Sequence, residues 1–135
     1  MTHDPDRHER AGRLHRLQEK IVHREEMRFA ALARRKATLV AERDALLERY
    51  SSVDLGLGLA AAAYGKRLAV IAHELAAIEQ PAEQQRRKVA AETSRARITG
   101  RALDRLDQAA REMQQRRELT EILEARLKNA RRRHG

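Results

Sequence analysis

The residues best suited to bind a metal ion are six histidines, at positions 3, 8, 15, 23, 73 and 134. A metal site needs histidines and carboxylates at spacings that bring three or four of them together. No two histidines stand with an acidic residue at such a spacing, and His15 and Glu19 are only neighbours on one helical face. The histidines therefore predict no metal site.

Phosphate binding or nucleophilic catalysis would fall to a short central segment that contains Ser51, Ser52 and Gly56-Leu57-Gly58. The glycines resemble a fragment of a phosphate-binding loop, but no lysine-serine or lysine-threonine pair follows them and no strand pattern precedes them. No histidine is placed to activate either serine, and Ser51 with Asp54 is more plausible as a turn or capping pair. We therefore expect no catalytic residue, no cofactor and no enzymatic activity.

Three basic clusters could bind phosphate or an acidic surface: Arg34-Arg35-Lys36, Arg86-Arg87-Lys88 and Arg131-Arg132-Arg133. Acidic residues interleave with the basic ones almost everywhere, no aromatic stacking platform exists, and no motif of a nucleic-acid reader is present. Residues 125–135 are the exception, with five basic residues and no acidic one. The pattern favours attraction to an acidic protein channel or groove over specific nucleic-acid binding, and a solvated helical face is the simpler interpretation.

The composition indicates long helices in place of a conventional globular core. Of 135 residues, 36% are charged and 2% aromatic, and 29 basic residues mixed with 20 acidic ones give a net charge of +9. Asp4, Asp6 and Glu9 interrupt any signal-peptide pattern, and the longest apolar run is shorter than the roughly 20 residues of a membrane span. We expect a soluble protein, and the absence of cysteine is compatible with a reducing cytoplasm.

The first predicted helical arm covers about residues 5–52. Asp4 is placed to cap it, Pro5 occupies the first helical position, and Asp6 adds acid to the first turn. The spacing of eleven between Ile21 and Leu32 looks like a stutter in an otherwise sevenfold pattern. The apolar stripe expected on this arm consists of Leu14, Leu17, Ile21, Phe29, Leu32, Leu39, Leu46, Tyr50 and Val53.

The second predicted arm covers about residues 59–132 and carries one heptad seam between residues 64 and 113. Its members step by alternating four and three residues. They are Tyr64, Leu68, Ile71, Leu75, Ile78, Ala82, Gln85, Val89, Glu92, Ala96, Thr99, Leu103, Leu106, Ala110 and Met113. Pro81 would normally end or kink a helix, but the seam stays in phase across it, which favours a kink over a break into three helices.

The two seams need apolar partners, and each can supply the other if the chain reverses near residues 51–58. The predicted fold is therefore all-α: a two-helix antiparallel coiled-coil hairpin forming a single domain over residues 1–135. The arms would be about 70 Å and 100 Å long at about 1.5 Å per residue. Their unequal length predicts that residues 119–133 lack a partner on the first arm.

The reversal itself is unusually apolar, since residues 53–64 carry a single charge where a solvent-facing turn is normally polar. Tyr50 and Tyr64 flank it, and the third aromatic residue, Phe29, lies on the first arm. An apolar tip on a charged helical pair indicates a contact surface. We expect this tip to be the functional end.

The chain resembles the FliJ family of the bacterial flagellar export apparatus and its injectisome counterparts, the YscO-type stalk proteins. The resemblance depends on overall length and on three segments: Arg13-Leu14-His15-Arg16-Leu17, Leu46-Leu47-Glu48-Arg49-Tyr50, and Tyr64-Gly65-Lys66-Arg67-Leu68-Ala69-Val70-Ile71. It covers nearly the whole chain. It implies an antiparallel stalk in the cytoplasm, peripheral to the inner membrane at the export apparatus.

The resemblance also implies partners and sites. The helical termini would enter the hexameric export ATPase FliI, with Arg131, Arg132 and Arg133 as a basic foot. The other end would contact the export gate protein FlhA, and export chaperones are further partners of the family. The residues implied for the gate contact flank the turn: Leu46, Tyr50, Tyr64, Leu68 and Ile71. Two departures concern affinity: Arg43 replaces an apolar residue, and the tip is shorter and richer in alanine than usual.

Two other classes of protein fit the same pattern. One is a structural or adaptor coiled coil that dimerises through these seams, for example as a parallel homodimer without a hairpin. The other is a basic nucleic-acid-binding coiled coil, whose affinity would fall steeply with salt.

Overall fold

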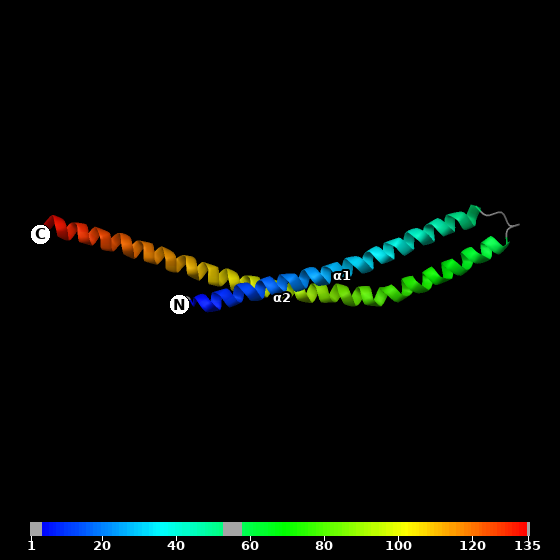
Figure 1. Cartoon of the computed structure of the whole chain (residues 1–135), viewed down its shortest axis with the longest axis horizontal. Coiled ribbons are helices and arrows are strands. Elements are labelled where there is room, and N and C mark those ends of the chain that lie inside the picture. The colour runs from blue at the N-terminus through cyan, green and yellow to red at the C-terminus, as the bar shows by residue number, and fades with distance from the viewer. Residues whose placement is uncertain (1–3, 53–57, 135) are drawn as a thin grey trace. The chain divides into compact units, whose positions relative to one another are not determined.

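The computed structural model describes residues 4–52 and 58–134, and these residues form two long helices and no strand. Helix α1 spans Pro5–Ser52 and helix α2 spans Gly58–His134 (Figure 1). The protein is therefore all-α, as the sequence predicted. Of the expected apolar tip at residues 53–64, residues 53–57 lie outside the described residues, and residues 58–64 form the start of α2.

The first turn of α1 is built by the residues that precede and open it. The Asp4 carboxylate oxygen Oδ1 accepts a hydrogen bond from the Asp6 backbone N–H at 3.0 Å, and the Asp4 carbonyl accepts one from the His8 N–H at 3.0 Å. Pro5 lacks a backbone N–H, which costs nothing at the first helical position. Asp4 is thus the cap that the sequence indicated.

Helix α2 continues without interruption through Pro81. The alternative of three helices is therefore not what the chain forms. Arg131, Arg132, Arg133 and His134 occupy the last turn of α2, where positive charge interacts favourably with the helix dipole.

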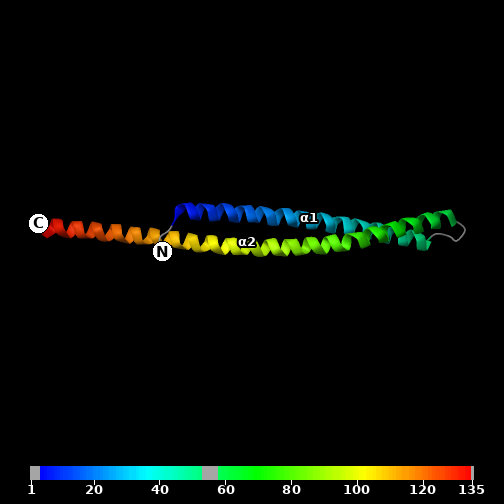
Figure 2. The same ribbon diagram turned by 90° about the horizontal axis from the view of Figure 1, so that it is seen from below.

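The helices form two compact units. Unit 1 contains residues 1–19 and 94–135, and unit 2 contains residues 20–93. Within each unit, α1 and α2 lie side by side in both views (Figures 1 and 2). Each unit therefore consists of a segment of α1 packed on a segment of α2.

Unit 2 shows the antiparallel direction through its polar contacts. Glu25 contacts Gln85, Arg35 contacts Glu74, and Glu42 contacts Arg67, so the α2 partner moves back along the chain as α1 advances. The core contains Leu39 and Ile71, each 0% exposed. The two helices of one chain thus form an antiparallel hairpin, and the parallel homodimer without a hairpin is excluded as a description of this fold.

Unit 1 is also antiparallel but is packed differently. His8 contacts Asp107, and His15 contacts Thr99. None of the described residues of unit 1 is a buried hydrophobic one, since Leu39 and Ile71 are the buried hydrophobics of the described chain. Unit 1 therefore combines these polar contacts with half-buried apolar residues such as Leu103 and Leu106, whereas unit 2 has fully buried apolar residues.

The seam predicted on α2 is confirmed by burial. All fifteen positions from Tyr64 to Met113 are buried or half-buried. The heptad spacing was therefore sufficient to predict which positions of α2 are covered.

The stripe predicted on α1 is wrong at Leu14, Leu17 and Tyr50, which are 54%, 55% and 48% exposed. Ile21 is half-buried as predicted, and Val53 lies outside the described residues. One set of the buried or half-buried positions of α1 keeps spacings of three, four or seven residues without a stutter. These positions are His8, His15, Gln18, Val22, Glu25, Phe29, Leu32, Leu39, Arg43 and Leu46.

Candidate partner-binding surfaces

The residues predicted to contact a gate protein lie at the C-terminal end of α1 and the N-terminal end of α2, in unit 2. The antiparallel pairing brings these two ends to the same end of the unit. Leu46, Tyr64 and Leu68 are half-buried, and Tyr50 is 48% exposed. We call Leu46, Tyr50, Tyr64 and Leu68 the turn-end residues.

Ile71 differs from the other predicted contact residues. Its side chain is 0% exposed and belongs to the core between α1 and α2. A partner that touches the surface of unit 2 does not reach it. Ile71 therefore contributes to the rigidity of the turn end and is removed from the candidate contact set.

Two exposed apolar residues near the turn end were not selected from the sequence. Leu47 is 48% exposed and stands three residues before Tyr50, so the two side chains share a face of α1. Val70 on α2 is 45% exposed. The sequence did indicate that they are exposed, because both are apolar residues that fall outside the heptad seam of their helix.

Glu42 and Arg67 fasten α1 to α2 close to the turn-end residues. The Arg67 guanidinium donates two hydrogen bonds to the Glu42 carboxylate, from Nε to Oε1 at 2.7 Å and from Nη2 to Oε2 at 2.9 Å. The hydrogen bond from Arg67 lowers the pKa of Glu42 and raises that of Arg67. A two-point contact of this kind fixes the relative orientation of the helices as well as their distance.

A buried polar pair lies farther along unit 2. Glu25 is 4% exposed and Gln85 is 9% exposed. The Gln85 amide Nε2 donates to the Glu25 carboxylate and, at 3.0 Å, to the Glu25 carbonyl oxygen. This hydrogen bond lowers the pKa of Glu25, with Arg28 and Arg24 adding to the effect. Because an unsatisfied buried polar group is costly, the pair favours a single register of α1 on α2.

Two of the three basic clusters are engaged by acidic residues of the same unit. Arg35 donates to Glu74 at 3.0 Å. Glu83 accepts from Arg86 at 2.7 Å and from Arg87 at 3.3 Å, and the hydrogen bond from Arg86 lowers the pKa of Glu83 to about 2. These clusters fit the simpler interpretation, a solvated and internally paired helical face.

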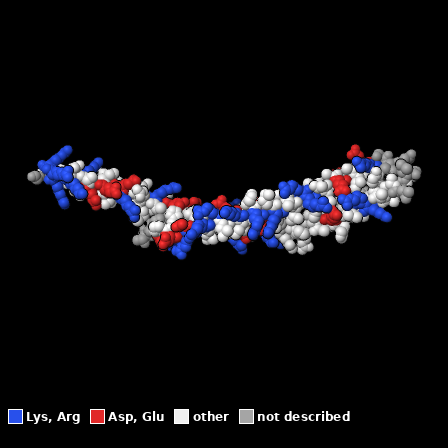
Figure 3. All heavy atoms as spheres, in the orientation of Figure 1, with Lys and Arg blue, Asp and Glu red and all other residues white. Residues whose placement is uncertain are grey.

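The third cluster is free. Arg131, Arg132 and Arg133 are exposed, and within the described part of the chain they form no ion pair. Lysine and arginine gather at this end of α2 (Figure 3). The cluster therefore has the exposure that a basic contact surface requires.

The cluster ends a stretch of α2 that nothing else covers. Every residue from Gln114 to His134 is exposed, whereas Met113 is half-buried. We call residues 114–134 the tail. Its freedom agrees with the prediction that residues 119–133 lack a partner on α1.

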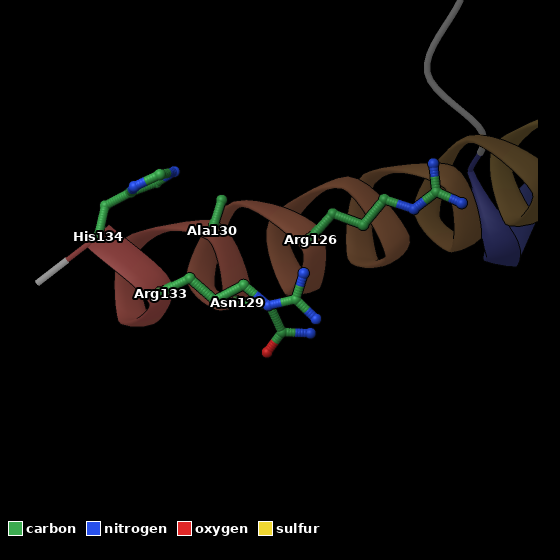
Figure 4. Close-up of a pocket in the computed structure, with 5 residues that line it drawn as sticks. All are labelled: Arg126, Asn129, Ala130, Arg133 and His134. Carbon is green, nitrogen blue, oxygen red and sulfur yellow. The ribbon is translucent and has the colours of Figure 1, made fainter.

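A shallow hollow of about 360 Å³ lies on the tail and is lined by Arg126, Asn129, Ala130, Arg133 and His134 (Figure 4). The Arg133 and Asn129 side chains extend toward each other along the helix, while His134 points away from them. Both carry N–H donors. The lining contains no acidic residue, so the hollow suits an anion.

The contact of α1 with α2 in unit 1 involves two histidines and two glycines that sequence reasoning did not select. The His15 ring nitrogen Nδ1 lies 2.9 Å from Thr99 Oγ1, and its Nε2 lies 2.9 Å from Glu19 Oε1. A Cβ atom placed on Gly100 would lie 3.1 Å from His15 Cε1, so the imidazole occupies the space that this glycine leaves. Gly12 of α1 is buried, and a Cβ atom placed on it would lie 3.9 Å from Leu103 Cδ1.

No group of three or more metal-binding side chains gathers among residues 4–52 and 58–134. Neither described helix contains a stretch long and apolar enough to cross a membrane. A second hollow, of about 270 Å³, lies in unit 2 beside Phe29 and Ala82.

No protein-family model, no curated protein and no solved structure matches this chain.

Proposed function

We propose that this protein is a non-enzymatic stalk of a bacterial type III protein export apparatus, of the flagellar kind, which couples the export ATPase FliI to the export gate protein FlhA. It would act in the cytoplasm, peripheral to the inner membrane, and export chaperones would be further partners. The proposal is supported by the resemblance of its three motif segments and by the antiparallel two-helix fold. The observation that carries it is that both required surfaces, the turn end and the basic end of α2, are accessible.

The turn-end residues would bind the gate. Tyr50 is half exposed, and Leu46, Tyr64 and Leu68 are each partly accessible around it. Aromatic side chains with an apolar ring and a polar hydroxyl are favoured anchors of protein interfaces because they bury much area at little entropic cost. The Glu42–Arg67 contact and the Ile71 core hold the two helix ends that carry these anchors.

The basic foot, Arg131, Arg132 and Arg133, would lie against acidic residues inside the ATPase ring. Arginine suits this role because its guanidinium forms paired hydrogen bonds with carboxylates. The tail presents these arginines without competition from intramolecular acidic partners among the described residues. The attraction would be strongest at low salt.

Coupling would be mechanical, since no bond is made or broken by the protein. Helix α2 runs unbroken from Gly58 to His134, so one hydrogen-bonded helix connects the gate-binding residues with the foot. A change in the ring would therefore reach the gate as a displacement of α2.

The gate contact is tested by replacing Tyr50→Ala and Tyr64→Ala together. We expect binding to the cytoplasmic domain of FlhA to fall by about tenfold or more, because two interface anchors are lost. Circular dichroism should stay nearly unchanged. Met27→Ala is the matched control, since Met27 is 49% exposed on α1 of the same unit; equal binding by the tyrosine variant and this control would remove the turn end from the proposal.

The foot is tested by replacing Arg131, Arg132 and Arg133 with glutamine. Stimulation of FliI ATPase activity should fall, because the acidic ring interior loses its basic partner. Arg116→Gln with Arg117→Gln is the control, since both arginines are exposed at the start of the tail. Full stimulation by the triple variant would place the ATPase contact elsewhere.

A further inference from the structure

The tail carries an apolar patch that the proposed function does not use. Leu119, Ile122, Leu123 and Leu127 are 60%, 51%, 59% and 59% exposed. Their spacing of three and four residues places them on one face of α2. These four large apolar side chains lie within about two turns of helix, and each is at least half exposed. An exposed apolar patch of this kind indicates a surface that binds a partner or a membrane.

The heptad seam of α2 does not continue into this patch. After Leu106, Ala110 and Met113, the next positions at the same spacing are Arg117, Thr120 and Glu124, which are polar. The apolar residues of the tail instead form a short, broad cluster on another face. A coiled-coil partner or a second copy of this chain would require a long narrow seam, whereas a broad cluster suits a flat apolar surface.

The charges of the tail are sorted around the patch. At about 100° per residue, Glu121 lies on the face of the helix opposite the leucines, and Glu118 and Glu124 lie on either flank, about 120° from the centre of the patch. Arg126 and Arg133 lie on the apolar side and line the 360 Å³ hollow with Asn129 (Figure 4). The face that bears the leucines is therefore also basic and free of acid.

We propose that the tail binds an anionic lipid bilayer, lying flat in its surface. Leu119, Ile122, Leu123 and Leu127 would enter the region between headgroups and acyl chains, and Arg126 and Arg133, on the same side of the helix, would pair with lipid phosphates. Apolar burial and attraction of basic residues to anionic headgroups are the two contributions that hold a helix in this position. Nothing in this inference depends on the export partners.

Lipid and an ATPase ring would compete for Arg133, which belongs to the foot and lies on the apolar side of the tail. A chain whose tail lies on a membrane would leave the foot unavailable, so anionic vesicles should reduce ATPase stimulation in a mixture of both. The inference thus adds a membrane-held state to the proposed stalk.

The test is flotation of the full chain with vesicles of phosphatidylcholine alone or mixed with phosphatidylglycerol. The chain should float with the anionic vesicles, remain unbound with the neutral ones, and be released by high salt. Leu123→Gln with Leu127→Gln should reduce binding about tenfold or more, because apolar burial is lost while the charge is unchanged. Both residues are exposed, so circular dichroism should not change.

Ile98→Gln is the matched control, because Ile98 is 66% exposed on the same helix and in the same unit but outside the tail. It should bind vesicles like the unmodified chain. Equal binding by the leucine variant, equal loss in the Ile98 control, or no binding to anionic vesicles would overturn the proposal. A dimer seen by light scattering that the leucine variant abolishes, without vesicle binding, would assign the patch to a second copy and reject the lipid surface.

Discussion

Units 1 and 2 are built from the same two helices but are held together by different means. Unit 2 has Leu39 and Ile71 fully buried and the Glu42–Arg67 contact between the helices. Unit 1 has no fully buried hydrophobic residue among those described, and its contacts between the helices include His8 with Asp107, His15 with Thr99, and the His15 ring against Gly100. Since apolar burial is the main stabilising contribution, unit 2 should hold the hairpin together and unit 1 should open first.

This difference suits the proposed division of roles. A gate contact at the turn end needs fixed side chains, because binding affinity is lost when an interface must first be ordered. The other unit carries the tail, whose residues 114–134 are all exposed and whose foot would, under the proposed function, enter and leave a partner. A weakly held unit can adjust to that partner at little cost.

The largest expected effect is in the core of unit 2. Ile71→Ala should lower the free energy of unfolding by about 2–5 kcal/mol, because a buried side chain leaves a cavity. Leu17→Ala in unit 1 should change it by only about 0.5 kcal/mol, since exposed positions contribute little. Thermal unfolding followed by circular dichroism measures both, and a larger loss for Leu17 would reverse the assignment of the core.

The second effect concerns the buried polar pair. Gln85→Ala should cost about 1–3 kcal/mol, because the Glu25 carboxylate loses its buried donor. Gln84→Ala is the control, since Gln84 is the exposed neighbour of the same residue type. Equal unfolding midpoints in urea for the two variants would show that the pair does not fix the register of unit 2.

The smallest effect distinguishes two glycines. Gly65→Ala in unit 2 should stabilise the protein by about 0.5–1 kcal/mol, because alanine favours helix and nothing lies within 4 Å of the new methyl group. Gly100→Ala in unit 1 should lose this gain or reverse it, because the His15 ring lies 3.1 Å from the added Cβ. Equal stabilisation by both substitutions, measured by thermal unfolding, would show that His15 does not pack against Gly100.

Much of the fold could be predicted from the sequence because α2 is regular. Its seam from Tyr64 to Met113 keeps one heptad phase, and the same spacing ends where the tail becomes exposed. The capping by Asp4 was equally local. Both follow from residue type and spacing alone.

The burial of Leu14 and Leu17 was mispredicted because the N-terminal half of α1 has two periodic faces. Counting apolar residues selects Leu14 and Leu17, whereas the phase of Leu46, Leu39, Leu32 and Phe29, extended backward, selects the polar positions that the structure uses, among them Gln18, His15 and His8. The partner helix decides between the faces: Thr99 and Gly100 offer a hydroxyl and an open space, which suit an imidazole better than a leucine. The sequence of α1 alone does not contain that information.

The candidate surfaces were predicted unevenly. Tyr50 and the basic foot are exposed and their contact roles stay predictions, whereas Ile71 is core, and the exposed Leu47 was passed over. A residue in the seam and a residue next to the seam can be of the same type, such as leucine, and differ only in the direction in which they leave the helix. The role of the apolar tip, residues 53–64, as the functional end stays a prediction.

Hydrogen exchange measured along the chain tests the contrast between the units most directly. Amides of residues 29–46 and 64–78 in unit 2 should exchange slowly and together. Amides of residues 5–19 should exchange much faster, although they belong to the same continuous helix α1 as residues 29–46. Equal protection across α1, or slower exchange in residues 5–19, would contradict the account.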